Sequence, residues 1–129
     1  MASPASSGKK KLLLIDDDPV FSELLAATIQ AHANLEIRME NDPRKALATA
    51  HDFQPNLILL DVVMPNFDGG DMHSKISSDA RLKNVPIVFL TSMVQQSEVD
   101  SHGGVIGGQR YLAKPVNLPQ LLDVLNSIK

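Results

Sequence analysis

Short runs of apolar residues alternate along this chain with longer segments in which apolar residues recur every three or four positions. A continuous apolar run is typical of a strand buried on both faces of a parallel sheet, and the wider spacing is typical of a helix that covers such a sheet. The predicted strands span residues 11–16, 35–40, 57–60, 87–90 and 110–113. The predicted helices span residues 19–32, 43–52, 71–78, 95–101 and 118–128.

Local capping signals mark where several of these helices begin. Asp18 with Pro19, and Asp42 with Pro43, each place a capping carboxylate before a proline, which is favoured at the first helical position. Asn117 gives the last helix a similar start. The apolar stripe predicted for the first helix comprises Val20, Phe21, Leu24, Leu25, Thr28 and Ile29.

The strict alternation of five strands with five helices predicts an α/β fold with a doubly wound, five-stranded parallel sheet. Right-handed crossovers and the flavodoxin-like strand order 2-1-3-4-5 are the simplest arrangement for such a chain. The second strand alternates polar and apolar residues, so we expect it at an edge of the sheet. Two glycine pairs, at 103–104 and 107–108, interrupt the pattern before the fifth strand and predict turns.

Composition narrows the class of protein. The 129 residues suffice for one domain with a hydrophobic core, which we expect at residues 10–129 after a disordered tail at residues 1–9. The absence of cysteine excludes a disulfide framework, thiol catalysis and a cysteine-ligated zinc site. A net charge of -3 provides no broad basic surface for direct binding of nucleic acid. No apolar run approaches the roughly 20 residues of a membrane span, and the first residues lack the pattern of a secretory signal, so we expect a cytoplasmic protein.

Five residues with reactive side chains stand at the ends of predicted strands. Asp16 and Asp17 end the first strand, Asp61 the third, Thr91 the fourth and Lys114 the fifth. In a doubly wound sheet, functional groups gather beyond the carboxyl ends of the strands, here at the switch point between the first and third strands. We therefore expect three carboxylates, a hydroxyl and an ammonium to converge at one edge of the sheet.

Three carboxylates in one place repel one another unless a cation neutralises them. Mg²⁺ is the cation that we expect, because it takes oxygen ligands and keeps waters beside phosphate oxygens. An aspartate beside Mg²⁺ can act as a nucleophile toward phosphorus. The metal, the Lys114 ammonium and the Thr91 hydroxyl would each meet one of the three equatorial oxygens of a phosphoryl group in transfer.

Four segments of the sequence resemble the four signatures of the response-regulator receiver domain, in the same order. They are LLLIDDDP, LILLDVVMPNFDGG, IVFLTS and YLAKP, and the resemblance extends over residues 10–129. The resemblance implies that Asp61 is the phosphorylated residue and that Asp16 and Asp17 are the acidic pair that holds Mg²⁺. It also implies that Thr91 is the switch hydroxyl and that Lys114 contacts the phosphoryl group.

The same resemblance implies roles for three other residues and for partner proteins. Val63 would ligate Mg²⁺ with its backbone carbonyl, Tyr111 would be the aromatic switch residue, and Pro115 would follow a cis peptide bond. Such domains receive their phosphoryl group from a histidine kinase or a histidine phosphotransfer protein. Their output surface, formed by the fourth helix, the fifth strand and the last helix, binds a downstream effector or a second copy of the chain.

Other functions compete with a phospho-accepting receiver. Asp16, Asp18 and Val20 fit the DxDx[VT] motif of haloacid-dehalogenase-type phosphatases, with Asp16 as the nucleophile. That class needs a further acidic pair at a late strand end, which the sequence after Lys114 does not supply, and it leaves Asp61 without a role. A pseudo-receiver that keeps the fold without the chemistry is a second alternative. A flavodoxin-like cofactor protein is disfavoured, because the acidic first loop would repel a flavin phosphate.

Two residues near the expected site differ from the polar side chains that help to position the hydrolytic water in receiver domains. Val63 lies two residues after Asp61, Met93 lies two after Thr91, and neither side chain hydrogen-bonds water strongly. We therefore predict slow loss of the phosphoryl group, and faster loss in the double variant Val63→Asn with Met93→Glu. The lifetime of the phosphorylated protein tests this, and an unchanged lifetime in the double variant would count against the explanation.

Overall fold

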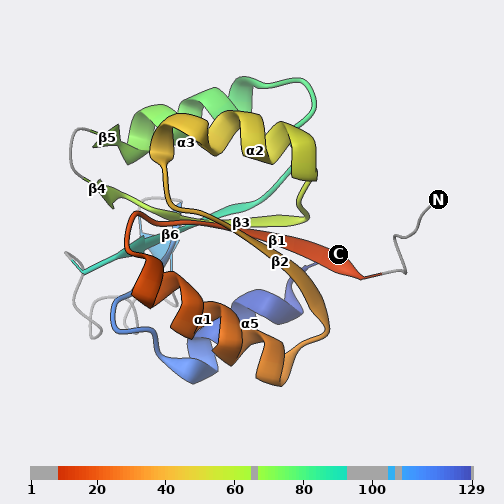
Figure 1. Cartoon of the computed structure of the whole chain (residues 1–129), viewed down its shortest axis with the longest axis vertical. Helices are drawn as coiled ribbons and strands as arrows, with labels where there is room; N and C mark the ends of the chain where they lie inside the picture. Colours follow the sequence, from red (N-terminus) through yellow and green to blue (C-terminus); the bar gives the residue numbers. More distant parts are fainter. Residues whose placement is uncertain (1–8, 65–66, 93–104, 107–108, 129) are drawn as a thin grey trace.

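The computed structural model describes residues 9–64, 67–92, 105–106 and 109–128. Within them, a six-stranded sheet lies between two layers of helices (Figure 1). Its strands are β1 (Lys10–Ile15), β2 (Leu35–Glu40), β3 (Leu57–Asp61), β6 (Ile87–Thr91), β7 (Val105–Ile106) and β8 (Gln109–Ala113). The helices are α1 (Pro19–His32), the 3-10 helix η1 (Pro43–Lys45), α2 (Ala46–Phe53), α3 (Gly69–Ser78) and α5 (Leu118–Asn126).

The strand order is β2-β1-β3-β6-β8-β7, and the first five of these strands run parallel. Numbered along the chain, these five are 2-1-3-4-5, so the predicted doubly wound α/β fold is confirmed, with β2 at the edge. β1 and β3 are neighbours, paired from Leu12 with Leu57 to Ile15 with Leu60. Their carboxyl ends therefore lie next to each other, at the switch point of the sheet.

Two short antiparallel pairings depart from the predicted pattern. β7 pairs with β8 and adds a sixth strand at the edge of the sheet, in a segment for which the sequence predicts only turns at the two glycine pairs. β4 (Val63–Met64) pairs with β5 (Phe67–Asp68) within the segment predicted as a loop after β3. Each of these strands except β8 has two residues, too few to establish a periodic pattern. They form because pairing satisfies backbone groups that would otherwise need another partner.

Four α-helices and η1 lie within the residues that the structure describes, where the sequence predicts five helices. The fourth predicted helix, at residues 95–101, lies outside the described residues, as do residues 1–8 of the predicted tail. The second predicted helix is divided, because Asp42 caps η1 by accepting the Arg44 N–H at 3.0 Å and α2 begins only at Ala46. None of the helices described is long and apolar enough to cross a bilayer.

The sheet separates two hydrophobic cores (Figure 1). Leu12 and Leu14 of β1 pack on the side of α1 and α5, whereas Leu13 and Ile15 pack on the side of α2 and α3. All four side chains are fully buried. Burial on both faces is the reason why β1 and β3 consist of continuous apolar runs. The two cores hold the central strands in register and so determine where their carboxyl ends lie.

The packing of α1 corrects its predicted apolar stripe. The buried residues of α1 are Ser22, Leu25, Ala26 and Ile29. Val20 and Leu24, which the stripe includes, are instead 65% and 66% exposed. Ser22 takes a buried position because its hydroxyl donates to the Asp18 carbonyl at 2.9 Å and accepts from Asn41 Nδ2 at 3.2 Å. The helix therefore turns a polar residue inward and presents two large apolar residues to solvent.

Candidate functional site

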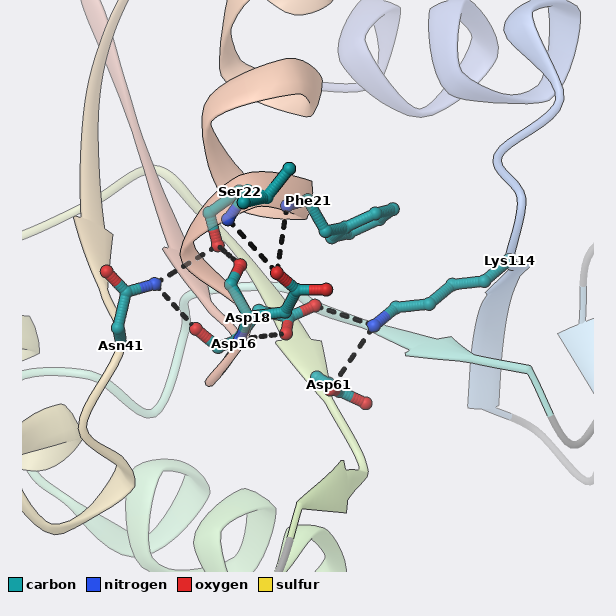
Figure 2. A network of polar contacts seen from close by, with 8 residues as sticks. Asp16, Asp18, Phe21, Ser22, Asn41, Asp61 and Lys114 are labelled. Carbon is teal, nitrogen blue, oxygen red and sulfur yellow. Dashed lines mark hydrogen bonds and ion pairs between the residues drawn. The ribbon is translucent and has the colours of Figure 1, made fainter.

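Asp16 follows β1 directly, and its side chain is fully buried. Its Oδ1 accepts the backbone N–H of Asp18 at 2.9 Å, and its Oδ2 accepts the Lys114 ammonium at 2.7 Å (Figure 2). The Asp16 carbonyl accepts Asn41 Nδ2 at 2.7 Å. The start of α1, the end of β2 and the end of β8 thus all fix the position of this residue.

Asp61 is the last residue of β3 and is 3% exposed. Its Oδ2 lies 3.3 Å from the Lys114 ammonium (Figure 2). Asp17, beside Asp16, is exposed. One carboxylate oxygen from each of Asp16, Asp17 and Asp61 lies within 4.8 Å of the other two. The structure thus brings together the three carboxylates that the sequence places at two different strand ends.

The Lys114 ammonium is shared by the two buried carboxylates. Burial by itself would lower the pKa of Lys114, but hydrogen bonds and charge–charge attraction from Asp16, followed by Asp61, outweigh it and raise that pKa above its usual value. Lys114 is therefore charged at neutral pH. Its Nζ also lies over the ring of Phe21, 4.3 Å from the ring centroid. The Lys114–Pro115 peptide bond is cis, as the resemblance implies.

Thr91 ends β6, the strand between β3 and β8, and is 2% exposed. Its carbonyl accepts the backbone N–H of Lys114 at 2.9 Å. The parallel pairing of β6 with β3 sets Leu90 opposite Asp61, so Thr91 follows at the same edge. Thr91 therefore lies among the residues with which the sequence groups it.

Tyr111 lies in β8, half-buried and opposite Phe89 of β6. The Tyr111 ring packs edge-on against Phe89, with centroids 5.4 Å apart. Phe89 packs in the same manner against His73 of α3, also at 5.4 Å. These contacts form an aromatic row that connects β8, β6 and α3.

Three other residues that the sequence analysis considers for the site are Asp18, Val63 and Met93. Asp18 caps α1, because its Oδ1 accepts the N–H groups of Val20 and Phe21 at 3.0 and 3.2 Å. Val63 begins β4, two residues beyond Asp61. Met93 lies outside the described residues.

Three residues that support the site were not singled out by the sequence. Phe21 contacts Lys114, and Asn41 and Ser22 tie the segment after β1 to the end of β2. The sequence hints at the hydrogen bond between Ser22 and Asn41 only through a serine within an apolar helical pattern and an asparagine directly after a strand. The contact between Phe21 and Lys114 had no signal, because the residues are far apart in sequence.

The acidic cluster has the chemistry of a site for a hard cation. Mg²⁺ prefers oxygen ligands, and Asp16, Asp17 and Asp61 offer three of them within 4.8 Å. The Lys114 ammonium offsets one of the three negative charges of these carboxylates, and a divalent ion would neutralise the other two. These residues therefore fit a magnesium ion.

Comparisons with known proteins agree with this geometry. The family model of the response regulator receiver domain matches residues 12–126. Protein PilH of Pseudomonas aeruginosa is 28% identical over 118 residues, which are 92% of this chain and 96% of PilH. The transcriptional regulator RpaA of Synechocystis is 31% identical over 113 residues, which are 87% of this chain and 46% of RpaA. The structure of the chemotaxis protein CheY4 of Vibrio cholerae matches with a TM-score of 0.75 and 28% identity, over 94% of this chain and 99% of the CheY4 chain.

The extent of these matches decides between the competing fold families. The chain spans about half of RpaA and almost all of PilH. The family match begins within β1, at Leu12, and includes β3, β6 and β8, the other strands that end at the site. This extent favours a receiver domain over a haloacid-dehalogenase-type phosphatase or a flavodoxin-like cofactor protein. The chain belongs to the response regulator receiver domain family.

Proposed function

We propose that Asp61 accepts a phosphoryl group and that the chain is the phosphorylated switch of a two-component phosphorelay. The position of Asp61 carries this proposal: it ends the central strand β3, 3.3 Å from the Lys114 ammonium. A carboxylate at this position has a cation beside it to attract the charged oxygens of an incoming phosphoryl group. It also has two further carboxylates, Asp16 and Asp17, beside it to hold a metal. Membership of the receiver family supports the same role.

In the proposed step, an oxygen of the Asp61 carboxylate forms a bond to phosphorus while the bond from phosphorus to the donor breaks. The donor leaves with the electron pair of that bond. Lys114 and Thr91 stand at the strand ends beside Asp61, and each would bind one oxygen of the phosphoryl group in transfer. The chain would thus catalyse only its own phosphorylation and dephosphorylation, and not the turnover of a separate substrate.

The proposed cofactor is Mg²⁺, held by Asp16, Asp17, Asp61 and the backbone carbonyl of Val63. The three carboxylate oxygens within 4.8 Å support this ligand set, as does the position of Val63 two residues beyond Asp61. When bound, the ion supplies positive charge that neutralises phosphoryl oxygens. The ion and the Lys114 ammonium would then share the same carboxylates.

The proposed switch passes through Thr91 and Tyr111. The Thr91 carbonyl already accepts the Lys114 N–H, so a hydroxyl drawn to the phosphoryl group would move the ends of β6 and β8 together. Tyr111 packs against Phe89 two residue pairs before Thr91 in the register of β6 with β8. Phosphorylation would thus shift an existing equilibrium between two arrangements of this edge, rather than create a new fold.

The proposed donor is a histidine kinase or a histidine phosphotransfer protein, in the cytoplasm. A donor must bring its histidine next to Asp61, and an apolar surface lies beside the site. Val20, Leu24 and Leu118 are exposed there, and a groove of about 230 Å³ lies between α1 and the segment from Pro115 to Leu121. On the output side, we propose that β8, α5 and the segment that precedes them bind a downstream effector or a second copy of the chain. No direct contact with nucleic acid or membrane is part of this proposal.

The first test is phosphorylation by acetyl phosphate in the presence of Mg²⁺. We expect intact-mass measurement to find one added phosphoryl group, and neither Asp61→Asn nor a sample without Mg²⁺ to acquire it. Asp18→Asn is the matched control, because asparagine caps a helix as well as aspartate and the Asp18 side chain caps α1. It should remain a substrate for acetyl phosphate.

The outcomes of this test separate the competing functions. Absence of an adduct on a protein with unchanged circular dichroism would favour a pseudo-receiver. An adduct that peptide mapping places on Asp16 would instead indicate the phosphatase-type nucleophile. Only a Mg²⁺-dependent adduct on Asp61 agrees with the proposal.

Removal of the lysine tests whether metal and ammonium compete for the carboxylates. We expect Lys114→Met to bind Mg²⁺ about tenfold more tightly, because a hydrogen bond to a charged group of about 1.5 kcal/mol no longer has to be given up. Titration of backbone amide shifts by NMR measures the affinity. Lys75→Met is the control, because it removes one positive charge from an exposed position in α3 and should change the affinity for Mg²⁺ little. Weaker binding by Lys114→Met would contradict this competition.

Removal of the Thr91 hydroxyl tests the proposed switch. Thr91→Ala should keep its affinity for Mg²⁺ but show a weaker response to beryllofluoride, read as the NMR shift changes of the Tyr111 ring. Thr91→Ser keeps the hydroxyl and should respond as the unaltered protein does. An unchanged response in Thr91→Ala would mean that the signal takes another route.

A further inference from the structure

Phe21 stands out because it is an apolar residue in direct contact with the ammonium of the site. It lies in the first turn of α1 and is half-buried. Its ring centroid lies 4.3 Å from Lys114 Nζ, well within the roughly 6 Å at which the face of an aromatic ring attracts a cation. Figure 2 shows the ring on the α1 side of the lysine, opposite Asp61. Among the residues that the structure describes, Lys114 therefore has neighbours of two chemical kinds, namely two carboxylates and one ring.

These three neighbours would respond differently to a metal ion. Asp16 and Asp61 hold Lys114 Nζ at 2.7 and 3.3 Å, but both belong to the cluster that fits Mg²⁺. An ion bound there would draw on the same carboxylate oxygens and weaken their hold on the ammonium. The ring of Phe21 has no metal-binding atom, so its attraction for the ammonium would remain.

We propose that Phe21 is a positioning residue, whose ring keeps the Lys114 ammonium beside Asp61 when Mg²⁺ engages the carboxylates. The proposal rests on the phosphoryl transfer proposed above and identifies what holds its lysine in place. A long lysine side chain without such a neighbour would leave the site for solvent in part of the molecules. Phosphoryl transfer would then lack its ammonium in that fraction.

The backbone of Phe21 is well anchored for this task. Its N–H donates to the capping carboxylate of Asp18 at 3.2 Å, and the Asp18 N–H donates to Asp16 Oδ1 at 2.9 Å. The backbone that carries the ring is thus tied through two hydrogen bonds to Asp16, whose carboxylate Lys114 also contacts. Phe21 also packs against the hydrophobic core on the side of α1 and α5, which restrains its side chain as well.

Substitutions at position 21 can separate the aromatic face from the apolar bulk. Phe21→Leu keeps an apolar side chain but has no ring, whereas Phe21→Tyr keeps the ring. Phe53→Leu is the control for the loss of a ring elsewhere in the protein, because the Phe53 ring contacts the side chains of Lys11 and Arg38. If Phe21 only packed, Phe21→Leu would be phosphorylated at nearly the rate of the unaltered protein, and Phe21→Tyr would be no faster than Phe21→Leu.

The first measurement is the rate of phosphorylation by acetyl phosphate at saturating Mg²⁺. We expect Phe21→Leu to react roughly 3- to 30-fold more slowly, the range that corresponds to loss of a cation–π contact at a partly desolvated site. Phe21→Tyr and Phe53→Leu should both react within about twofold of the unaltered protein, a difference too small to reflect loss of a contact with Lys114. The affinity for Mg²⁺ should change little in all three variants. A leucine variant as fast as the unaltered protein, or a tyrosine variant as slow as the leucine variant, would overturn the proposal.

The second measurement is independent of phosphorylation. With Mg²⁺ present, the ring of Phe21 should shift the NMR signals of the Lys114 ε-methylene protons upfield, and the shift should persist in Phe21→Tyr and vanish in Phe21→Leu. If the shift is absent from the unaltered protein with Mg²⁺, the ring does not hold the lysine and the proposal fails. If the shift is present but acetyl phosphate adds no phosphoryl group, the proposed function fails, and the role of Phe21 in transfer fails with it. Should Phe21→Leu not fold by circular dichroism, Phe21→Met replaces it in both measurements.

Discussion

Two carboxylates are buried at the carboxyl edge of this sheet, and both of them need a cation beside them. Asp16 is fully buried and Asp61 is 3% exposed, and a buried charge without a partner would be strongly destabilising. One ammonium, that of Lys114, contacts both carboxylates. It can do so only because β1, β3 and β8 are parallel and end at the same edge. The two-sided hydrophobic core maintains that register.

The start of α1 is the second anchor of the site. The same few residues cap the helix, bind the carboxylate of Asp16 and place Phe21 against Lys114. Asn41 joins this segment to the end of β2 through the Asp16 carbonyl and the Ser22 hydroxyl. A change in the partners of Lys114 would therefore be transmitted to α1 through hydrogen bonds and a ring contact. The acidic cluster, the first helix turn and the groove beside it form one connected unit.

This organisation explains how one site can both perform chemistry and act as a switch. The side chain of Lys114 contacts the acidic cluster, and its backbone leads through Pro115 into α5. Its backbone N–H binds the end of β6 at Thr91, so the lysine connects two strand ends as well as two carboxylates. Binding of a divalent ion or a phosphoryl group would redistribute the partners of this single cation. A small local change in charge would thus reach several elements at once.

The sequence by itself determined the five parallel strands, their order and the shared edge of Asp16, Asp61, Thr91 and Lys114. Apolar runs and helical spacing are local properties of the sequence, and they also show which residues stand at strand ends. In a parallel sheet, the residues at the carboxyl ends of neighbouring strands lie close together. Only the tertiary structure decided which partners these side chains have. The contact of Phe21 with Lys114 depends on the rotation of α1 about its axis, and that rotation buries Ser22, which bonds to a residue after β2. The exposure of Leu24 and the edge strand β7 likewise depend on what packs or pairs with them, because an apolar residue or a two-residue strand has no intrinsic signal of its partner.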